Sequence, residues 1–149
     1  MARSNRTLTQ FAVDQFKQFA SGKNIDLIAQ VQGNTTTCVH LDRFNNEVTF
    51  QVFLFDICIF EADSTHITTR NGGFFDSKGR PSRTTRERLN GLLDAAGELG
   101  WIPEGVRAFL TNNGQKDTCC IGKGETCGVL DSQSPDRIIA RNPEQLLIF

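Results

Sequence analysis

Apolar side chains recur at mostly three- and four-residue steps near the N-terminus, at Leu8, Phe11, Val13, Phe16 and Phe19. Because this spacing places them on one face of a helix, the pattern predicts a helix over residues 7–20. Ser4 or Thr7 can cap the start of this helix, and Ser21-Gly22 can end it.

A second set of apolar positions at helical spacing comprises Leu89, Leu92, Leu93 and Ala96. This stripe predicts a helix over residues 83–97. Ser82 or Thr84 supplies an N-cap, and Gly97 supplies the stop. Both ends of the second helix are therefore marked in the sequence.

Between the two helices the apolar residues are largely β-branched or aromatic and lie in short runs, which predicts strands. The expected strands are residues 25–31, 38–41, 48–60 and 66–69. Residues 48–60, VTFQVFLFDICIF, form the most apolar stretch and predict one buried central strand. Residues 66–69 are mostly polar or small and predict a return strand near an edge of the sheet.

In the C-terminal part, residues 106–110 and 118–121 predict a further hairpin that turns at Asn112-Asn113-Gly114. Residues 122–149 are rich in turn formers and are expected to form a loop-rich C-terminal extension. The whole pattern predicts an α+β fold in a single domain of residues 1–149. In this fold a mainly antiparallel sheet of hairpins carries the N-terminal helix and the second helix, at about 83–97.

The composition narrows the class of protein. Apolar residues make up 38% of the chain and charged residues 22%, as in ordinary globular proteins, so we expect a folded, soluble protein. No apolar run approaches the roughly 20 residues that a bilayer requires, and no signal peptide is recognised, so no membrane partner is expected. The five cysteines are an odd number without a secretory signal, which favours reduced thiols in a cytoplasm.

Charge is distributed unevenly along the chain. Residues 70–90 carry six Lys and Arg against two Asp and Glu, a local charge of +4. The flanking residues 1–69 carry five against seven, and residues 91–149 carry five against eight. One basic segment therefore lies between two mildly acidic ones.

The basic residues of this segment lie on a polar loop and at the start of the second helix, where free N–H groups and the helix dipole favour an anion. Threonine hydroxyls and guanidinium groups there can hold a phosphate together. The candidate anion-binding or nucleic-acid-binding residues are Arg70, Lys78, Arg80, Arg83, Thr84, Thr85, Arg86 and Arg88. The alternative interpretation is a solvated face on which the arginines pair with Asp76 and Glu87.

No complete catalytic or metal-binding signature is present. Cys119, Cys120 and Cys127 lack the paired CxxC spacing of a structural zinc site, so no metal is expected. His40 and His66 belong to no nucleophile signature, and the chain has no tyrosine. We therefore expect a protein that acts by binding, without catalytic residues or a cofactor.

The segments LFDICIF, HITTRNGGF and RTTRERLN, in this order, resemble a family of small tailed-phage proteins. That family has an apolar strand, a Gly-Gly turn and a helix that begins Thr-Thr-Lys/Arg-x-Arg-Met/Leu-Asn. The likeness covers residues 54–97, and the matched positions are Gly72, Gly73, Thr84, Thr85, Arg86, Arg88 and Asn90. The inserted loop FDSKGRPSR and the N- and C-terminal additions depart from it. The family has no assigned activity, so the resemblance implies a phage-encoded accessory protein in the host cytoplasm and no mechanism.

Two hypotheses describe the partner. In the first, residues 70–88 contact the phosphates of a nucleic acid, and Phe74 or Phe75 stacks on bases unless these rings belong to the core. In the second, a surface built by the acidic flanks binds and inhibits a host protein, such as a defence or transcription enzyme, in an anti-defence role. A virion component and a homo-oligomer stay open, the latter because an edge strand is expected.

Overall fold

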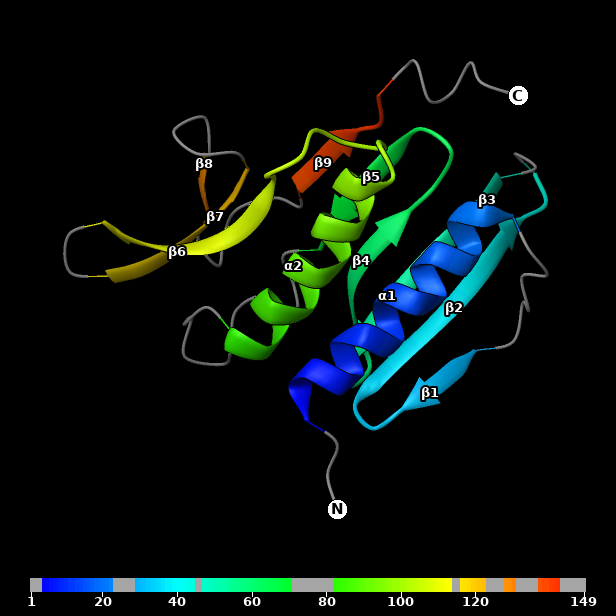
Figure 1. Cartoon of the computed structure of the whole chain (residues 1–149), viewed down its shortest axis with the longest axis horizontal. Coiled ribbons are helices and arrows are strands. Elements are labelled where there is room, and N and C mark those ends of the chain that lie inside the picture. Colours follow the sequence, from blue (N-terminus) through cyan, green and yellow to red (C-terminus); the bar gives the residue numbers. More distant parts are fainter. Residues whose placement is uncertain are drawn as a thin grey trace.

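The computed structural model describes residues 4–22, 29–44, 47–70, 82–113, 116–122, 128–130 and 137–142, with side chains described up to residue 108 and again from residue 138. Two helices, α1 (Asn5–Ser21) and α2 (Arg83–Glu98), lie on one face of a six-stranded antiparallel sheet (Figure 1). The α+β prediction is thereby confirmed, with both predicted helices packed on the sheet.

The strands form two sheets. In sheet order the first comprises β1 (Gln30–Gln32), β2 (Thr35–Asp42), β3 (Glu47–Leu54), β4 (Ile57–Ala62), β5 (His66–Thr69) and β9 (Arg137–Ala140). The second comprises β6 (Arg107–Asn113), β7 (Lys116–Gly122) and β8 (Gly128–Leu130), and it projects beside α2 (Figure 1). The predicted hairpin after residue 106 is the β6–β7 pair, in which Asn113 lies opposite Lys116.

Local capping fixes the start of each helix. The Ser4 hydroxyl accepts a hydrogen bond from the Thr7 N–H, and the Ser82 hydroxyl accepts one from the Thr85 N–H, both at 3.2 Å. Ser4 and Ser82 thus satisfy N–H groups that a helix start otherwise leaves free. Gly22 ends α1 with a φ of 72°, as the sequence predicts.

The predicted stop of α2 at Gly97 is wrong by one residue. The helix continues to Glu98, and Gly97 is buried inside it because the backbone of Glu104 packs there, where a Cβ on Gly97 would lie 3.3 Å from Glu104 Cα. The chain instead turns at Gly100, with a φ of 76°. This glycine at position 97 therefore serves close packing rather than helix termination.

The prediction of one central strand over residues 48–60 is wrong. A turn at Phe55-Asp56 divides the stretch into β3 and β4, and Leu54 lies opposite Ile57 in the resulting hairpin. The Phe55 N–H donates to the Asn34 carbonyl at 2.7 Å, so the turn is held by the neighbouring β1–β2 connection. The sequence pattern does not indicate this turn, because Phe55 occupies a position where Gly or Asn is usual.

The predicted edge position of residues 66–69 is also wrong, because β9 pairs with β5 and places Ile67 opposite Ile139. The polar character of β5 has another cause. Ile67 and Thr69 are buried on the helix-covered face, whereas His66 and Thr68 lie on the opposite, outer face.

Within the C-terminal extension expected to be loop-rich, β8 and β9 are strands, and β9 completes the main sheet.

The core between helices and sheet is aromatic at its centre. The ring centroid of Phe16 on α1 lies 5.6 Å from those of Phe50 and Phe60 and 5.3 Å from that of Trp101. Phe16, Phe50 and Phe60 are essentially inaccessible to solvent. Tilted and edge-on pairs of this kind add about 0.5–1.5 kcal/mol each beyond the burial of their area. They hold α1 firmly on the sheet.

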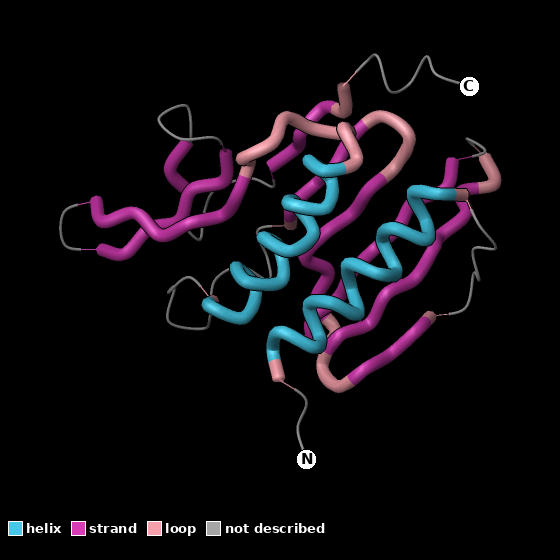
Figure 2. Tube along the Cα trace, in the orientation of Figure 1, coloured by secondary structure: helices cyan, strands magenta, loops and turns pink. Residues whose placement is uncertain are grey.

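The two helices lie side by side (Figure 2) and run in the same direction, which the colouring along the sequence shows (Figure 1). Near their starts Asn5 contacts Glu87, and near their ends Lys17 lies 3.8 Å from Glu98. Between these points the helices approach closely at Gly91, where a Cβ would overlap the Thr9 side chain. The missing side chain of Gly91 therefore sets the distance between α1 and α2.

We expect Gly91→Ala to lower the free energy of unfolding by about 1–3 kcal/mol, the usual effect of overpacking. This loss should appear although alanine is intrinsically better than glycine in a helix by about 1 kcal/mol. Urea unfolding followed by circular dichroism measures it. Thr9→Ser removes the methyl group that is overlapped and keeps the hydroxyl, so the double variant Thr9→Ser/Gly91→Ala should regain most of the loss. Equal stability of Gly91→Ala and the wild type would contradict the close crossing.

Candidate functional site

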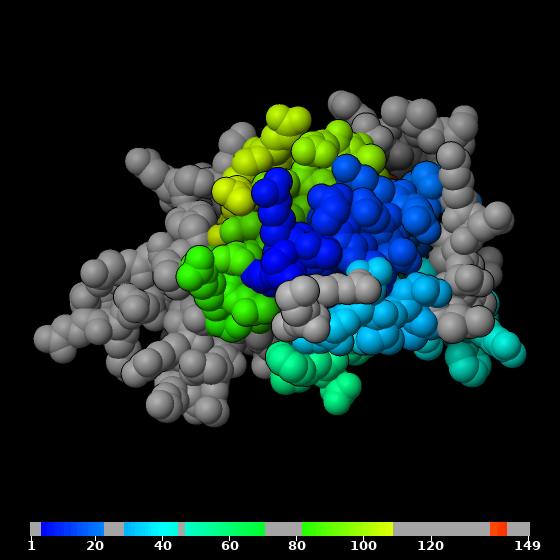
Figure 3. Space-filling view, turned by 60° about the horizontal axis from the view of Figure 1, so that its bottom comes forward, coloured from blue at the N-terminus to red at the C-terminus, as the bar shows by residue number. Residues whose placement is uncertain are grey.

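The starts of α1 and α2 lie side by side at one end of the molecule. The Asn5 amide donates to the Glu87 carboxylate, and Arg88 Nη1 donates to the Asn5 carbonyl at 2.9 Å. In the space-filling view the dark-blue start of α1 and the green start of α2 share one face (Figure 3). The first turn of each of these helices contains no acidic residue. Because the helices are parallel, the positive ends of their dipoles add at this end.

Three arginines and one threonine that are accessible to solvent at the two starts form what we call the helix-start surface: Arg6, Arg83, Thr84 and Arg86. The Arg83 side chain is 82% exposed, and its Nε donates to Glu87 Oε1 at 2.9 Å. Arg6 is exposed and Arg86 half-exposed, and neither side chain forms a hydrogen bond or ion pair with another residue that the structure describes. Within the described part of the chain, Arg6 and Arg86 thus present their guanidinium groups at this end without a protein acceptor.

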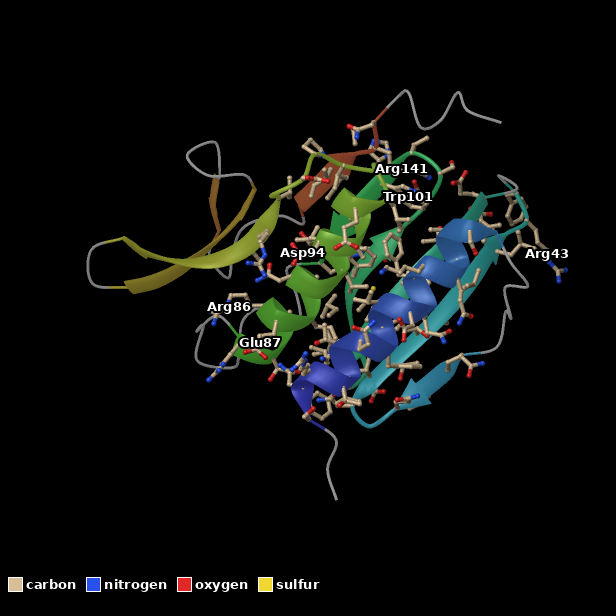
Figure 4. All side chains as sticks on the ribbon, in the orientation of Figure 1. Arg43, Arg86, Glu87, Asp94, Trp101 and Arg141 are labelled. Carbon is tan, nitrogen blue, oxygen red and sulfur yellow. The ribbon has the colours of Figure 1, made fainter. Side chains whose placement is uncertain are left out.

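Among the described residues, Glu87 places a negative charge at this surface, in contact with Arg83 and Asn5. The hydrogen bond from Arg83 holds the pKa of Glu87 below its usual value, and the hydrogen bond from Asn5 and the charge of Arg86 act in the same direction. Glu87 is therefore ionised at neutral pH and offsets one arginine. The Arg83–Glu87 ion pair is one of the pairings expected if the arginines form a solvated charged face. Figure 4 shows Arg86 and Glu87 at this start of α2 and Arg43 at the far end of the molecule.

Arg88 is a structural residue, which corrects its assignment to the anion-binding set. Its side chain is fully buried, and Nη1 donates to the Asn5 carbonyl, to Asn5 Oδ1 at 2.8 Å and to Thr9 Oγ1 at 2.5 Å. Nη2 donates to Asn34 Oδ1 at 3.3 Å. Burial lowers the pKa of Arg88, but an arginine stays charged at neutral pH. Arg88 thus ties α2 to the first turn of α1 and to the β1–β2 turn.

Two other predicted residues, Thr85 and Arg70, are engaged elsewhere in the structure. Thr85 is buried behind the Ser82 cap. Arg70 lies on the outer face of the sheet, where its Nε and Nη2 donate to Glu61 Oε1 at 2.9 and 2.5 Å. Lys78 and Arg80 lie outside the described residues, as do Phe74, Phe75 and Asp76. Of the eight candidates, the structure therefore brings Arg83, Thr84 and Arg86 together at the helix start.

Arg6 was missed because its position depends on tertiary structure. It lies in the first turn of α1, 77 positions before Arg83 in the sequence, and no local pattern relates the two. The parallel packing of α1 and α2 through Arg88 and Gly91 brings them to the same end. The local signal that exists is the Ser4 cap followed by a basic rather than an acidic first turn.

A cleft of about 370 Å³ runs between α1 and α2 from this end. Its wall on α2 carries Glu87, Asp94 and Glu98. Beyond the helix start this wall is acidic, whereas the wall on α1 carries Arg6 and Lys17. The cleft is therefore mixed in charge, and a polyanion is better accommodated at the helix-start surface.

The environment of the two thiols on the outer face of the sheet, Cys38 and Cys58, disfavours the thiolate form. Burial, followed by the Glu61 carboxylate, raises the pKa of Cys58 to about 12. The same two causes raise the pKa of Cys38. Both thiols are therefore protonated at neutral pH. Among the described residues, no group of three or more His, Cys, Asp and Glu could hold a metal ion.

Comparison with protein-family models, with curated proteins and with solved structures finds no match. The likeness to small tailed-phage proteins therefore stays a prediction from the sequence. In the part of the chain that the structure describes, no helix is both long and apolar enough to cross a membrane. The function has to be argued from the geometry of the helix-start surface.

Proposed function

We propose that the protein binds nucleic acid and that the phosphates of the ligand lie at the helix-start surface. The observation that carries the proposal is the side-by-side placement of two parallel, serine-capped helix starts with Arg6, Arg83 and Arg86 around them. Cations are unfavourable at a helix N-terminus on their own, because the dipole and the guanidinium groups repel each other. A phosphate removes this repulsion and accepts charge-assisted hydrogen bonds from the arginines.

The chemistry of the site favours a phosphate backbone over a single small anion. The arginines come from two separate helices, and Glu87 lies between them beside Arg83. A ligand that presents several phosphates in series can reach Arg6 and Arg86 together while avoiding Glu87. Contacts of this kind carry no base sequence information, so binding is expected to be largely independent of sequence.

The biological setting of this activity rests on the resemblance over residues 54–97. On that basis the chain is a phage-encoded accessory protein that acts by binding in the host cytoplasm, without catalysis. The matched residue Asn90 is assigned to the scaffold of α2 rather than to the ligand, because its side-chain amide bonds both the N–H and the carbonyl of Ala108. The ligand contacts proposed for this chain are Arg6, Arg83 and Arg86.

Binding should weaken steeply as salt rises, because each phosphate contact releases counterions. Fluorescence anisotropy with a labelled strand of roughly 20 nucleotides, over about 50 to 300 mM KCl, measures this dependence. Three contacts to a single strand predict a slope of about −2 for log K against log salt. Absent binding at the lowest salt, or binding independent of salt, would remove the proposal and leave inhibition of a host protein as the hypothesis to test.

A further inference from the structure

The same end of the molecule carries exposed apolar side chains. Phe55, in the turn between β3 and β4, is 72% exposed, and Ile57 at the start of β4 is 51% exposed. In the space-filling view, the blue-green segment of this turn projects on the face that also carries the starts of α1 and α2 (Figure 3). The face that carries the helix-start surface therefore also carries a turn with an exposed aromatic residue, which the sequence does not reveal.

A short chain of hydrogen bonds fixes this turn relative to the helix starts. The Phe55 N–H donates to the Asn34 carbonyl at 2.7 Å, and Asn34 Oδ1 accepts from Arg88 Nη2 at 3.3 Å. Arg88 in turn donates to the Asn5 carbonyl in the first turn of α1. The ring of Phe55 is thus carried by a backbone that is joined to both helices.

The conformation of Phe55 is strained. Its φ of 55° lies in the left-handed region, and among the described residues no other non-glycine residue has a positive φ. A bulky residue is unfavourable there, and Asn or Gly would serve the turn better. The ring gains little burial in return, because most of it faces solvent. An exposed aromatic side chain on a strained turn is typical of a residue kept for contact with a ligand.

We propose that Phe55 stacks on an unpaired base and that the ligand of the helix-start surface is single-stranded nucleic acid. The inference rests on the proposed function. A single strand offers base faces for an apolar ring and phosphates for arginines, which is the usual combination in proteins that bind such strands. A duplex keeps its base faces stacked inside and presents mainly phosphate and sugar at its surface. Ile57, exposed at the start of β4, is a further apolar side chain next to this turn in the sequence.

A second copy of the chain suits this surface less well. Two-fold pairing through Phe55 would bring the nearby arginines of both copies toward each other, and like charges in proximity oppose association. A negatively charged strand is attracted by the same arginines. Charge complementarity therefore favours the nucleic acid.

Phe44 provides a matched control. It is fully exposed, in the turn between β2 and β3, and its N–H donates to the Asp42 carboxylate at 3.0 Å. This turn lies at the other end of β3 from Phe55, away from the helix starts. Phe44→Ala removes the same ring from a surface that the proposal does not involve.

The experiment compares three labelled probes of equal length by anisotropy: a single strand of thymidines, a blunt duplex, and a strand of abasic sugar-phosphates. The wild type should bind the thymidine strand at least ~5-fold more tightly than the duplex, in line with the usual effect of one stacked base. Phe55→Ala should weaken binding to the thymidine strand by at least ~5-fold and leave binding to the duplex and to the abasic strand unchanged. Phe44→Ala should change none of the three.

Phe55→Trp serves as a second readout, because it should retain binding and its indole fluorescence should be quenched by the thymidine strand and not by the abasic strand. Equal binding of strand and duplex, or an unchanged affinity of Phe55→Ala, overturns the stacking and leaves phosphate binding intact. If none of the probes binds, the proposed function fails as well. A dimer that sediments as such and dissociates in Phe55→Ala, with unchanged binding to all probes, assigns the surface to a second copy instead.

Discussion

Arg88→Ala is expected to lower the free energy of unfolding by about 3–5 kcal/mol, the range for removing one partner from a buried charged network. The substitution leaves the Asn5 carbonyl and the side chains of Thr9 and Asn34 without the donor that they share. It also opens a cavity, because Arg88 is among the largest fully buried side chains. Urea unfolding followed by circular dichroism gives the value.

Arg88→Met separates the loss of charge from the loss of packing at this position. Methionine keeps most of the side-chain volume, so the variant should lose less stability than Arg88→Ala. It should still be less stable than the wild type, because the oxygen atoms that accept from Arg88 lose their donor. Arg86→Ala, two positions earlier and half-exposed, should stay within about 0.5 kcal/mol of the wild type. An Arg88→Ala variant as stable as Arg86→Ala would show that Arg88 does not join the helices.

Reversing two charges of the helix-start surface is expected to have the largest effect on binding. The double variant Arg83→Glu/Arg86→Glu should bind a single strand of roughly 20 nucleotides at least ~30-fold more weakly at low salt, because each change removes an attraction and adds a repulsion. Anisotropy measures the affinity. The effect on folding should be small: the new carboxylate at position 83 would face Glu87 one turn away, whereas an acidic first turn interacts favourably with the helix dipole.

The matched control for this variant is Arg43→Glu. Arg43 is exposed and lies at the far end of the molecule (Figure 4). This substitution changes the net charge by the same amount as each of the two reversals. It should alter the affinity by less than about twofold, beyond the long-range effect of net charge. A loss of log K in Arg43→Glu that is half the loss in the double variant would mean that overall charge, and not the helix-start surface, determines binding.

Local signals were sufficient for the helices and for the fold class. The Ser4 and Ser82 caps and the apolar stripes act within one or two turns of helix, so they can be read without knowledge of the partners. The division of residues 48–60 into two strands depends on the Asn34 carbonyl, which accepts from Phe55. The position of β5 depends on residues 137–140, about 70 positions later. Both contacts join residues that are far apart in the sequence, so a local pattern cannot predict them.

The candidate site was predictable in part. Thr85, Arg88 and Leu92 lie on one stripe of α2, and this helical spacing could have indicated that Arg88 is buried. Summing charge over a window does not distinguish a buried arginine from an exposed one. Arg6 and Phe55 come from other elements, and tertiary contacts that include Arg88 and Asn34 place them at the end of the molecule where α2 starts.

The most direct test of nucleic-acid binding at the helix-start surface is the salt dependence of the variant Arg6→Gln/Arg83→Gln/Arg86→Gln, measured against the wild type on the same single strand. Glutamine removes the positive charges and adds no repulsion of the phosphates. The difference between the two slopes of log K against log salt is therefore proportional to the number of phosphate contacts that are lost. We expect the slope of log K against log salt to be shallower by about 2 in the variant. Identical slopes, with binding retained in both proteins, would contradict it.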